Sequence, residues 1–335
     1  MPIKVLHVGL GPIGAGVVRQ TASRPGLLTV GAVDVDPAKI GRDVGEVCRL
    51  RRRLGVVVTQ DLAQAIRATR ADVVVLCTSS SLVQVLPVLE TVLKLKVPIV
   101  STTEELAYPV KQHAAMAKRI DALAKRGRVA VLATGVNPGF VMDALPIALT
   151  AVCARVDSIE VDRVQDARSR RQPFQRKIGA GLTVEEFSAQ LEAGTVRHVG
   201  LAQSISMIAD AMGWKLDRIS DDIQPKLATS AVSSGPITVA PGHVSGLVQD
   251  GVGYRKGRPL ITLHMEAYLD APESFDAVRI AGVPPLTMKI SGGVHGDIAT
   301  EAIVVNSIPK LLQAAPGLRT MRDMVLPAYW GGKKA

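Results

Sequence analysis

The sequence predicts an α/β protein with a doubly wound parallel sheet and an additional α+β region that contains a mixed or antiparallel sheet. Three observations support this fold class. The chain begins with a short apolar strand that passes through glycines into a helix. Buried strands then alternate with helices up to about residue 133, and half-buried alternating strands dominate the later part.

The first strand leads into a glycine-rich turn. Lys4–Val8 is mostly apolar and β-branched, as in a central parallel strand. Gly9, Gly11 and Gly14 follow in the spacing Gly-x-Gly-x-x-Gly, which allows a tight turn, backbone approach to a pyrophosphate and close helix packing. Pro12 suits the first helical turn, whose free N–H groups attract anions. A strand–helix turn without a ligand would also use such glycines.

A second strand makes the nucleotide interpretation stronger. Leu28–Val33 ends in Asp34, about 20 residues past the last glycine, where an acidic residue binds ribose hydroxyls. We therefore predict a Rossmann domain that binds NAD or NADP. Asp34 favours NAD by repelling a 2′-phosphate, whereas Lys39 or Arg42 could reach one. Together with strand-end polar groups, the predicted cofactor-binding residues are Gly9, Gly11, Pro12, Ile13, Gly14, Asp34, Asp36, Cys77, Thr78, Ser79, Thr102 and Asn137.

Length and composition limit the class of protein and the number of domains. The 335 residues are 47% hydrophobic and 21% charged, which predicts a globular protein with two domains. Aromatic residues make up only 3%, which argues against a base-stacking nucleic-acid surface. The net charge of +10 suits an anionic cofactor or substrate, although it also serves solubility.

Cysteine spacing and hydropathy predict the cellular compartment of the protein. Cys48, Cys77 and Cys153 are widely spaced, so they predict neither disulfides nor a zinc site and favour the cytoplasm. The first strand starts within three residues, which leaves no room for a signal peptide. No uncharged apolar run reaches the ~18 residues of a membrane helix. We expect no metal and no membrane association.

The pattern of elements places the domain boundaries. Residues 1–140 form the predicted dinucleotide-binding domain, 141–295 a substrate and dimerisation domain, and 296–335 a helix returning to the first domain. Predicted helices lie at Asp61–Thr69, Leu82–Lys96, Glu105–Arg126, Phe140–Ala154, Thr183–Ala193, Gly200–Met212 and Gly296–Ala314. Predicted later strands lie at Val56–Thr59, Asp72–Cys77, Val97–Ser101, Val129–Ala133, Ser158–Ala167, Ile223–Val232, His243–Tyr254, Leu260–Leu269 and Leu286–Ile290.

Two adjacent carboxylates, Glu104 and Glu105, follow a central strand at the end where the nicotinamide should lie. One of them can point into the cleft while the other supports the helix start. Both can equally be first-turn acids that the helix dipole favours. The residues alone leave this choice open.

Other segments carry polar groups that suit a substrate site. Asn137-Pro-Gly139 follows a strand but also reads as an interdomain turn. Arginines in 168–177 could grip a carboxylate or simply be solvated. His295 stands between glycines before Thr300, which can bind a ligand or cap the helix. His264, in an apolar strand, is more often a core histidine than a ligand.

The motifs together resemble the 2,4-diaminopentanoate dehydrogenase family, which includes native amine dehydrogenases. The resemblance runs over nearly the whole chain, through Gly9–Gly14, Val33–Pro37, Ser101–Leu106, Thr134–Phe140, Arg163–Asp166, Pro173–Gly181 and Gly292–Thr300. Dihydrodipicolinate reductase and homoserine dehydrogenase are wider relatives. The reductase's paired-histidine motif is absent, and homoserine dehydrogenases carry a lysine where this chain has Glu104.

The resemblance implies an NAD(P)-dependent amine dehydrogenase, and it selects Glu104 as the catalytic residue because a carboxylate suits an amine or ammonium. The implied reaction is oxidative deamination of a primary amine, reversed as reductive amination of a ketone or aldehyde with ammonia; 2,4-diaminopentanoate is one candidate substrate. The predicted substrate-binding residues are Phe140, Met142, Leu145, Gln165, Arg168, His264, His295 and Thr300.

Two alternatives remain at this point. One is an ammonia-independent reductase or dehydrogenase of the dihydrodipicolinate reductase or homoserine dehydrogenase type. The other is a non-catalytic nucleotide-sensing protein. The open face of the second sheet predicts a homodimer, and the expected partners are otherwise a small amine or ketone and ammonia, without nucleic acid.

Overall fold

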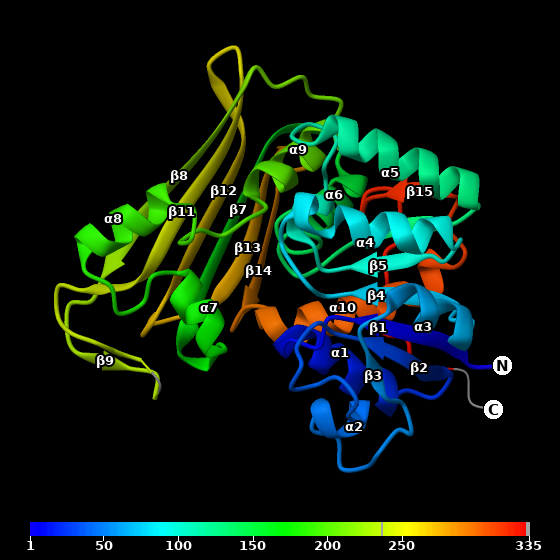
Figure 1. Cartoon of the computed structure of the whole chain (residues 1–335). Coiled ribbons are helices and arrows are strands. Elements are labelled where there is room, and N and C mark those ends of the chain that lie inside the picture. Colours follow the sequence, from blue (N-terminus) through cyan, green and yellow to red (C-terminus); the bar gives the residue numbers. More distant parts are fainter. Residues whose placement is uncertain (236, 333–335) are drawn as a thin grey trace. The chain divides into compact units, whose positions relative to one another are not determined.

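The structure is a computed structural model that describes residues 1–235 and 237–332 (Figure 1). The chain forms two compact units. The first comprises Met1–Gly139 and Asp297–Ala335, and the second comprises Phe140–Gly296. Within the described residues, no helix has both the length and the apolar character needed to cross a membrane.

A seven-stranded sheet forms the centre of the first unit, in the order β15-β6-β5-β4-β1-β2-β3, and every pair in it is parallel. The winding direction reverses at β1, which lies between β2 and β4. The doubly wound prediction is therefore confirmed. The strands are β1 (Ile3–Val8), β2 (Leu27–Val33), β3 (Val58–Thr59), β4 (Val73–Leu76), β5 (Ile99–Ser101), β6 (Ala130–Ala133) and β15 (Gly317–Arg319).

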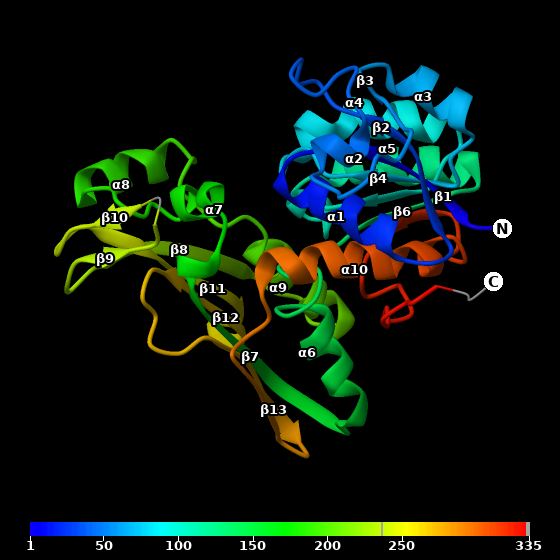
Figure 2. The ribbon, with the colours of Figure 1, turned by 90° about the horizontal axis from the view of Figure 1, so that it is seen from below.

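Helices cover both faces of this sheet, which is why its central strands are apolar throughout. Figures 1 and 2 show α1 and α10 along one face and α3, α4 and α5 along the other. Asp61 caps α3, because its carboxylate accepts the backbone N–H of Gln64 at 2.9 Å. The helices are α1 (Pro12–Ser23), α2 (Val44–Val47), α3 (Leu62–Thr69), α4 (Leu82–Lys94), α5 (Ala114–Gly127) and α10 (Gly296–Leu311).

The predicted helix Glu105–Arg126 is wrong over its first half. The structure has a single 3₁₀ turn, η1 (Glu104–Leu106), then irregular turns, and α5 begins only at Ala114. Pro109 explains the difference, since it lacks an N–H donor and disfavours helical backbone at Tyr108.

The second unit is built on a six-stranded sheet in the order β14-β13-β7-β12-β11-β8. It is mixed, because β7 and β12 are parallel while the other pairs are antiparallel. Positive φ angles at Lys256 (52°) and Gly257 (74°) make the tight turn between two of its antiparallel strands. The strands are β7 (Arg155–Asp166), β8 (Arg218–Leu227), β11 (Val244–Arg255), β12 (Arg258–Tyr268), β13 (Phe275–Val283) and β14 (Leu286–Ser291).

One face of this sheet is covered by α9 (Leu201–Ala211), which approaches so closely that a Cβ on Gly251 would meet Ile205 at 3.0 Å. The opposite face carries partly exposed charged side chains, among them Asp162, His264 and Glu266. We call this second surface the open face. The other elements of the unit are α6 (Ala144–Leu149), η2 (Thr150–Val152), η3 (Ala167–Ser169), α7 (Gln172–Lys177), α8 (Val184–Glu192), β9 (Val232–Ser233) and β10 (Thr238–Val239).

Two predictions for this unit need correction, and two of its elements were missed. The helix expected at Phe140–Ala154 is shorter, because Asp143 caps it by accepting the N–H of Ala144 at 2.6 Å. The strand expected at Ile223–Val232 is β8, which ends at Leu227 and tolerates Pro225 because it is an edge strand. Strand β13 and helix α7 were not predicted.

Candidate active site

The glycine turn after β1 forms an open cradle at the start of α1. Gly9 has a φ of +86°, and a Cβ there would meet the Cys77 carbonyl oxygen at 2.6 Å. A Cβ on Gly14 would collide with the Gly9 carbonyl oxygen, whereas nothing lies within 4 Å of a Cβ on Gly11. Gly11 precedes Pro12 as the cap residue of α1. The turn therefore leaves room above Gly11 for a phosphate group at the helix N-terminus.

Asp34, at the end of β2, is held rigidly beside this turn. Its carboxylate accepts the backbone N–H groups of Leu10 (2.7 Å) and Asp36 (2.9 Å) and lies 3.1 Å from the Lys39 ammonium. Burial alone would raise the pKa of Asp34, but the hydrogen bonds and Lys39 outweigh burial and lower it. Asp36 accepts the N–H of Ala38 and also approaches Lys39, at 3.4 Å.

Polar groups continue along the carboxyl edge of the sheet after β4 and β5. The Thr78 side chain is exposed there, while Ser79 donates to Gln84 at 2.7 Å. Desolvation raises the pKa of the Cys77 thiol to about 12, although a hydrogen bond with Thr102 lowers it somewhat. Cys77 is therefore a neutral lining group and no nucleophile.

The two neighbouring glutamates have different surroundings. The Glu105 carboxylate accepts the N–H of Leu82 at 2.7 Å, which caps α4, and lies 3.5 Å from His113 Nε2. Glu104 is half-buried and begins η1 directly after β5. The contacts of Glu105 thus tie it to the start of α4, whereas Glu104 lies directly after β5, at the strand end where the sequence predicts the nicotinamide.

The loop after β6 is tied to α10. The backbone N–H of Val136 donates to Thr300 Oγ1 at 3.2 Å, and a Cβ on Gly135 would lie 3.6 Å from the same oxygen. Asn137 follows in this loop and is buried. The structure therefore brings Asn137 and Thr300 to the same part of the first unit.

In the second unit, Gln165 and His295 belong to one connected cluster. Gln165 Nε2 donates to the Val294 carbonyl oxygen at 3.0 Å, directly before His295, and Gln165 Oε1 accepts from Arg170 at 2.8 Å. The Arg170 guanidinium also stacks on Phe174, 4.0 Å from the ring centre. Both hydrogen-bonding ends of Gln165 are thus engaged in positioning neighbours.

Arg168 is differently placed from Arg170. Its guanidinium forms ion pairs with Asp166 (2.6 Å) and Asp270 (2.8 Å). These two carboxylates disfavour the predicted role of Arg168 in binding a substrate carboxylate. Among the predicted apolar lining residues, Met142 is fully buried, while Phe140 and Leu145 are half-buried.

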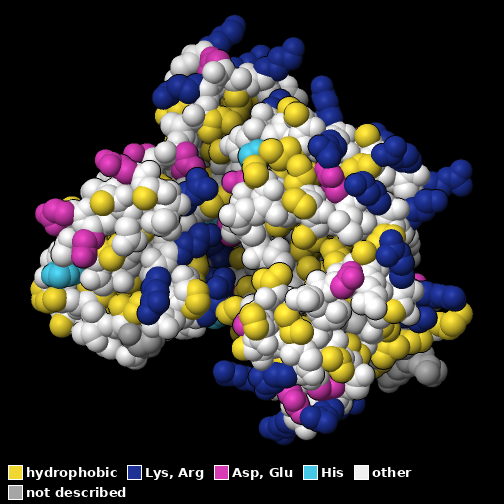
Figure 3. All heavy atoms as spheres, viewed as in Figure 1, with side chains coloured by type: hydrophobic (Ala, Val, Ile, Leu, Met, Phe, Trp, Pro, Cys, Tyr) yellow, Lys and Arg dark blue, Asp and Glu magenta, His cyan; other side chains and the backbone are white. Residues whose placement is uncertain are grey.

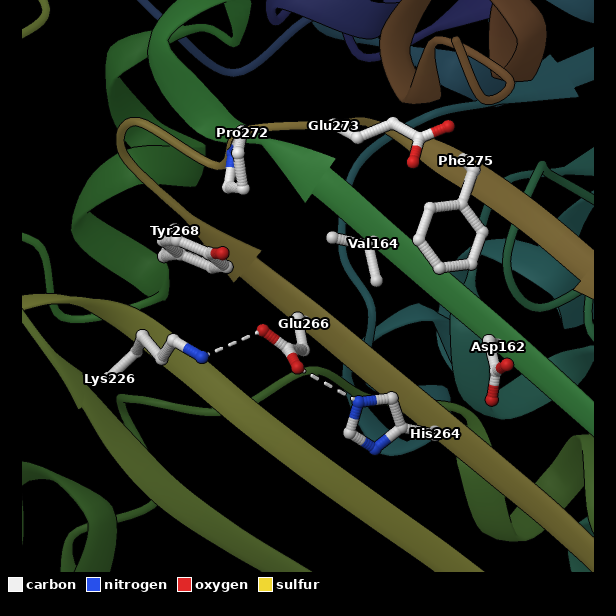
Figure 4. Close-up of a pocket in the computed structure, with 9 residues that line it drawn as sticks. All are labelled: Asp162, Val164, Lys226, His264, Glu266, Tyr268, Pro272, Glu273 and Phe275. Atoms are coloured by element: carbon white, nitrogen blue, oxygen red, sulfur yellow. Dashed lines mark hydrogen bonds and ion pairs between the residues drawn. The ribbon is translucent and has the colours of Figure 1, made fainter. Parts of the chain in front are cut away.

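His264 does not join the cluster around Gln165. It pairs in register with Asp162 on β7, and alternation places Gln165 on the opposite face of the sheet. On the open face it contacts Asp250 (2.7 Å) and Glu266 (3.1 Å), beside a hollow of about 460 Å³ (Figure 4). Its predicted placement in one substrate site with Gln165 therefore needs correction.

A buried ion pair was missed by the sequence reasoning. Arg163 and Asp276 are 2% and 1% exposed, and Arg163 Nη1 lies 2.5 Å from Asp276 Oδ1. One signal was available: Arg163 falls at an inward-facing position of an alternating strand, where a charge requires a partner. The identity of that partner, on β13, had no local signal.

Charge and metal chemistry add little to the site. Lys and Arg side chains are spread over the visible surface with Asp and Glu among them, so the net charge does not form a single patch in this view (Figure 3). Among the described residues, no group of three or more His, Cys, Asp or Glu side chains could hold a metal ion.

The parallel sheet, its glycine turn and the anchored acidic residue after β2 define the first unit as a Rossmann-type dehydrogenase domain. Residues 3–133 match the family model of the dihydrodipicolinate reductase N-terminus, and residues 140–335 match that of the 2,4-diaminopentanoate dehydrogenase C-terminal domain. The chain is 36% identical to 2,4-diaminopentanoate dehydrogenase of Acetoanaerobium sticklandii, over 97% of this chain and 94% of that protein.

Two further comparisons agree with this assignment. The chain is 24% identical to an amine dehydrogenase of Streptomyces virginiae over 95% of both sequences. Its fold matches the solved structure of an amine dehydrogenase from Mycobacterium smegmatis with a TM-score of 0.88, at 23% identity and over 99% of both chains. The chain belongs to the 2,4-diaminopentanoate dehydrogenase family and is an oxidoreductase that acts on CH–NH2 groups.

Proposed function

We propose that the protein is an NAD(P)-dependent amine dehydrogenase that oxidatively deaminates a primary amine and, in reverse, aminates a ketone or aldehyde with ammonia. The observation that carries the proposal is the position of Glu104 after β5, beside a second glutamate that is engaged in capping α4. A carboxylate at this point suits a positively charged amine or iminium group.

The first unit fits a nicotinamide cofactor. Gly9 and Gly14 leave no space for a side chain, so the backbone of the turn is kept close to β1 and open above Gly11. Asp34 would hold the adenosine ribose, and the strand-end groups Thr78 and Thr102 would face the other half of the cofactor. When bound, the oxidised nicotinamide accepts the hydride from the substrate carbon.

Glu104 has three tasks in this proposal. The substrate ammonium must lose a proton before its carbon can release hydride, and the Glu104 carboxylate accepts that proton. Glu104 passes this proton to solvent, and its carboxylate then stabilises the iminium ion that hydride loss forms. Water adds to the iminium carbon while Glu104 accepts one water proton, and Glu104 returns that proton to the nitrogen. The carbon–nitrogen bond then breaks as the hydroxyl proton passes to Glu104, which gives ammonia and the carbonyl product.

We further propose an amine that carries a carboxylate as the substrate class, with 2,4-diaminopentanoate as the leading candidate. The relative from Acetoanaerobium sticklandii bears that name. In the second unit, Gln165, a predicted substrate-binding residue, and Phe174 position the Arg170 guanidinium. We therefore propose Arg170 as the carboxylate partner in place of Arg168, which pairs with Asp166 and Asp270.

For the cofactor we propose a preference for NAD. Asp34 is a fixed, ionised carboxylate at the ribose position, and Lys39 is engaged with both Asp34 and Asp36. A 2′-phosphate would have to displace this arrangement and approach the Asp34 charge.

The test compares Glu104→Gln with Glu105→Gln in ammonia-dependent oxidation of NADH and NADPH over ketones, aldehydes and amino-keto acids. Glu104→Gln should abolish amination and retain cofactor binding, because only the proton acceptor is lost. Glu105→Gln should retain activity, since the amide oxygen can still accept the N–H of Leu82. Full activity in Glu104→Gln contradicts the proposal. Turnover without ammonia identifies a reductase, and cofactor binding without any turnover identifies a nucleotide sensor.

A further inference from the structure

The loop that carries His295 is held by an unusual set of contacts inside the second unit. Gly292 and Gly293 have φ angles of +78° and +65°, so they turn the chain sharply after β14. The turn brings the peptide groups of Val294 to the buried ion pair of Arg163 and Asp276. His295 comes next in sequence and is half-buried.

Both backbone groups of Val294 are fixed by charged or polar side chains. Its N–H donates to Asp276 Oδ2 at 2.7 Å, and its carbonyl oxygen accepts from Arg163 Nη2 at 2.9 Å and from Gln165 Nε2 at 3.0 Å. Asp276 uses its other oxygen to bind Arg163. The ion pair therefore closes a ring of hydrogen bonds around a single residue.

Ordinary fold stability is a weak reason for this arrangement. A buried ion pair is often no more stabilising than apolar residues of similar volume, because both charges lose their hydration. Its particular effect is directional, since a paired guanidinium and carboxylate fix the atoms that they bond. Here the fixed atoms belong to the loop before His295, and Gln165 extends the same network to Arg170.

We propose that Arg163 and Asp276 are positioning residues that aim His295 toward the substrate without touching it. This inference rests on the proposed function, in which Arg170 binds the substrate carboxylate, and on the sequence prediction that His295 also binds the substrate. Gly296, directly after His295, allows the Arg170 guanidinium to lie against this loop, because a Cβ at Gly296 would collide with it.

The main experiment uses Asp276→Asn, with Asp157→Asn as the matched control. Asp157 is an exposed carboxylate on β7 that pairs only locally with the guanidinium of Arg155 at 2.9 Å. We expect Asp276→Asn to lower kcat by about 10- to 100-fold, as misplacement of a site group does. Cofactor affinity should not change, and Asp157→Asn should match the wild type. In Asp276→Asn/His295→Ala, kcat should be no lower than in His295→Ala alone.

A second readout does not depend on activity. The chain has six histidines, so the His295 ring resonance can be assigned by its loss in His295→Ala. This resonance should shift in Asp276→Asn and stay unchanged in Asp157→Asn. If Asp276→Asn does not fold, Arg163→Met/Asp276→Leu removes both charges together and leaves no buried charge unpaired.

The outcomes separate the two proposals. An unshifted His295 resonance in a folded variant that lacks the ion pair, or a kcat equal to that of Asp157→Asn, overturns the positioning role. Multiplicative effects of Asp276→Asn and His295→Ala overturn it as well, because the pair would then act elsewhere. Failure of the proposed function appears instead as full activity in Glu104→Gln, a variant in which the His295 resonance is expected to be unchanged.

Discussion

Glu104 and Glu105 show how neighbouring residues of one type can have different surroundings. The sequence offers two carboxylates at a strand end and gives no reason from charge alone to separate them. The structure separates them through Leu82, whose N–H binds Glu105 from the start of α4. The residue that decides the issue is 23 positions away, so local sequence could not reveal it.

Asp34 allows a prediction about cofactor choice. Asp34→Ser removes the carboxylate that repels a 2′-phosphate and frees Lys39 from its nearer partner. We expect the ratio of NADPH to NADH affinity to rise by about tenfold or more, because one charge repulsion becomes a possible attraction. Dissociation constants for both cofactors measure the change, with Asp157→Ser, at an exposed carboxylate of the second unit, as the control. An unaltered ratio in Asp34→Ser would show that Asp34 does not set the preference.

His7 leads to a prediction about acid stability. Its ring is buried in β1, where Nε2 lies 3.3 Å from Thr29 Oγ1, and burial lowers its pKa to about 3. As the pH falls, the unfolded chain binds a proton at His7 near pH 6.5, whereas the folded chain binds it only near pH 3. The free energy of unfolding therefore decreases as the pH falls from 6.5 to 3. At pH 5 this linkage costs about 2 kcal/mol.

The variant His7→Gln removes this titration. Urea unfolding at pH 7 and pH 5 should show a smaller loss of stability in the variant than in the wild type. Equal losses would mean that other groups govern the acid side. The effect of His264 on stability has the opposite pH dependence. Burial would lower its pKa, but Asp250 and Glu266 raise it, so the stability that His264 contributes is lost as the pH rises through the raised pKa.

At the scale of the element, substitutions in the glycine turn before α1 distinguish an effect on folding from an effect on cofactor binding. Gly11 has a φ of −67° and open space around it, so Gly11→Ala should fold normally. Its methyl group would occupy the space of the pyrophosphate and weaken cofactor binding by about tenfold or more. Gly14→Ala should lower both stability and binding, because its methyl group meets the Gly9 carbonyl. Thermal unfolding and cofactor titration distinguish the two; unchanged cofactor affinity in Gly11→Ala contradicts the assignment of the turn.

The elements differ in how well local sequence predicts them. Helix α8 was foreseeable because Thr183 and Glu186 form a capping box, with hydrogen bonds of 3.1 and 2.9 Å. Pro109 carried a signal against a long helix that outweighs the apolar periodicity around it. Strand β13 had no such signal, since Asp276 faces inward only because Arg163 lies opposite on β7.

At the scale of the whole molecule, the open face of the second unit supports the proposal of a homodimer. The face combines charged residues with the apolar side chains of Val164 and Phe275. We expect a dimeric mass by light scattering at micromolar concentration. Val164→Lys should produce monomers, because the ammonium would lose its hydration at the contact, whereas Val152→Lys on an exposed turn should not. A monomeric wild-type protein would contradict this expectation.

The candidate site was predictable only where chemistry and local pattern coincide. The glycine turn and Asp34 could be found because their spacing follows from strand and helix geometry. Arg168, Arg170 and His264 could not be sorted, since their roles depend on Asp166, Gln165 and Glu266 respectively. The contacts of each charged side chain depend on its partners in the folded chain, so local propensity does not predict them.

The way in which the first unit is assembled determines when it can fold during synthesis. Strand β15 forms its sheet edge beside β6, and α10 reaches α1, where Arg24 contacts Asn306 and donates to the Trp330 carbonyl oxygen. All of these partners lie in the last 39 residues, 297–335, whereas the second unit is continuous in sequence. On the ribosome, the second unit can close while the first still exposes an unpaired β6 and an uncovered α1. A nascent chain stopped before residue 297 should therefore need chaperone protection for its first unit alone.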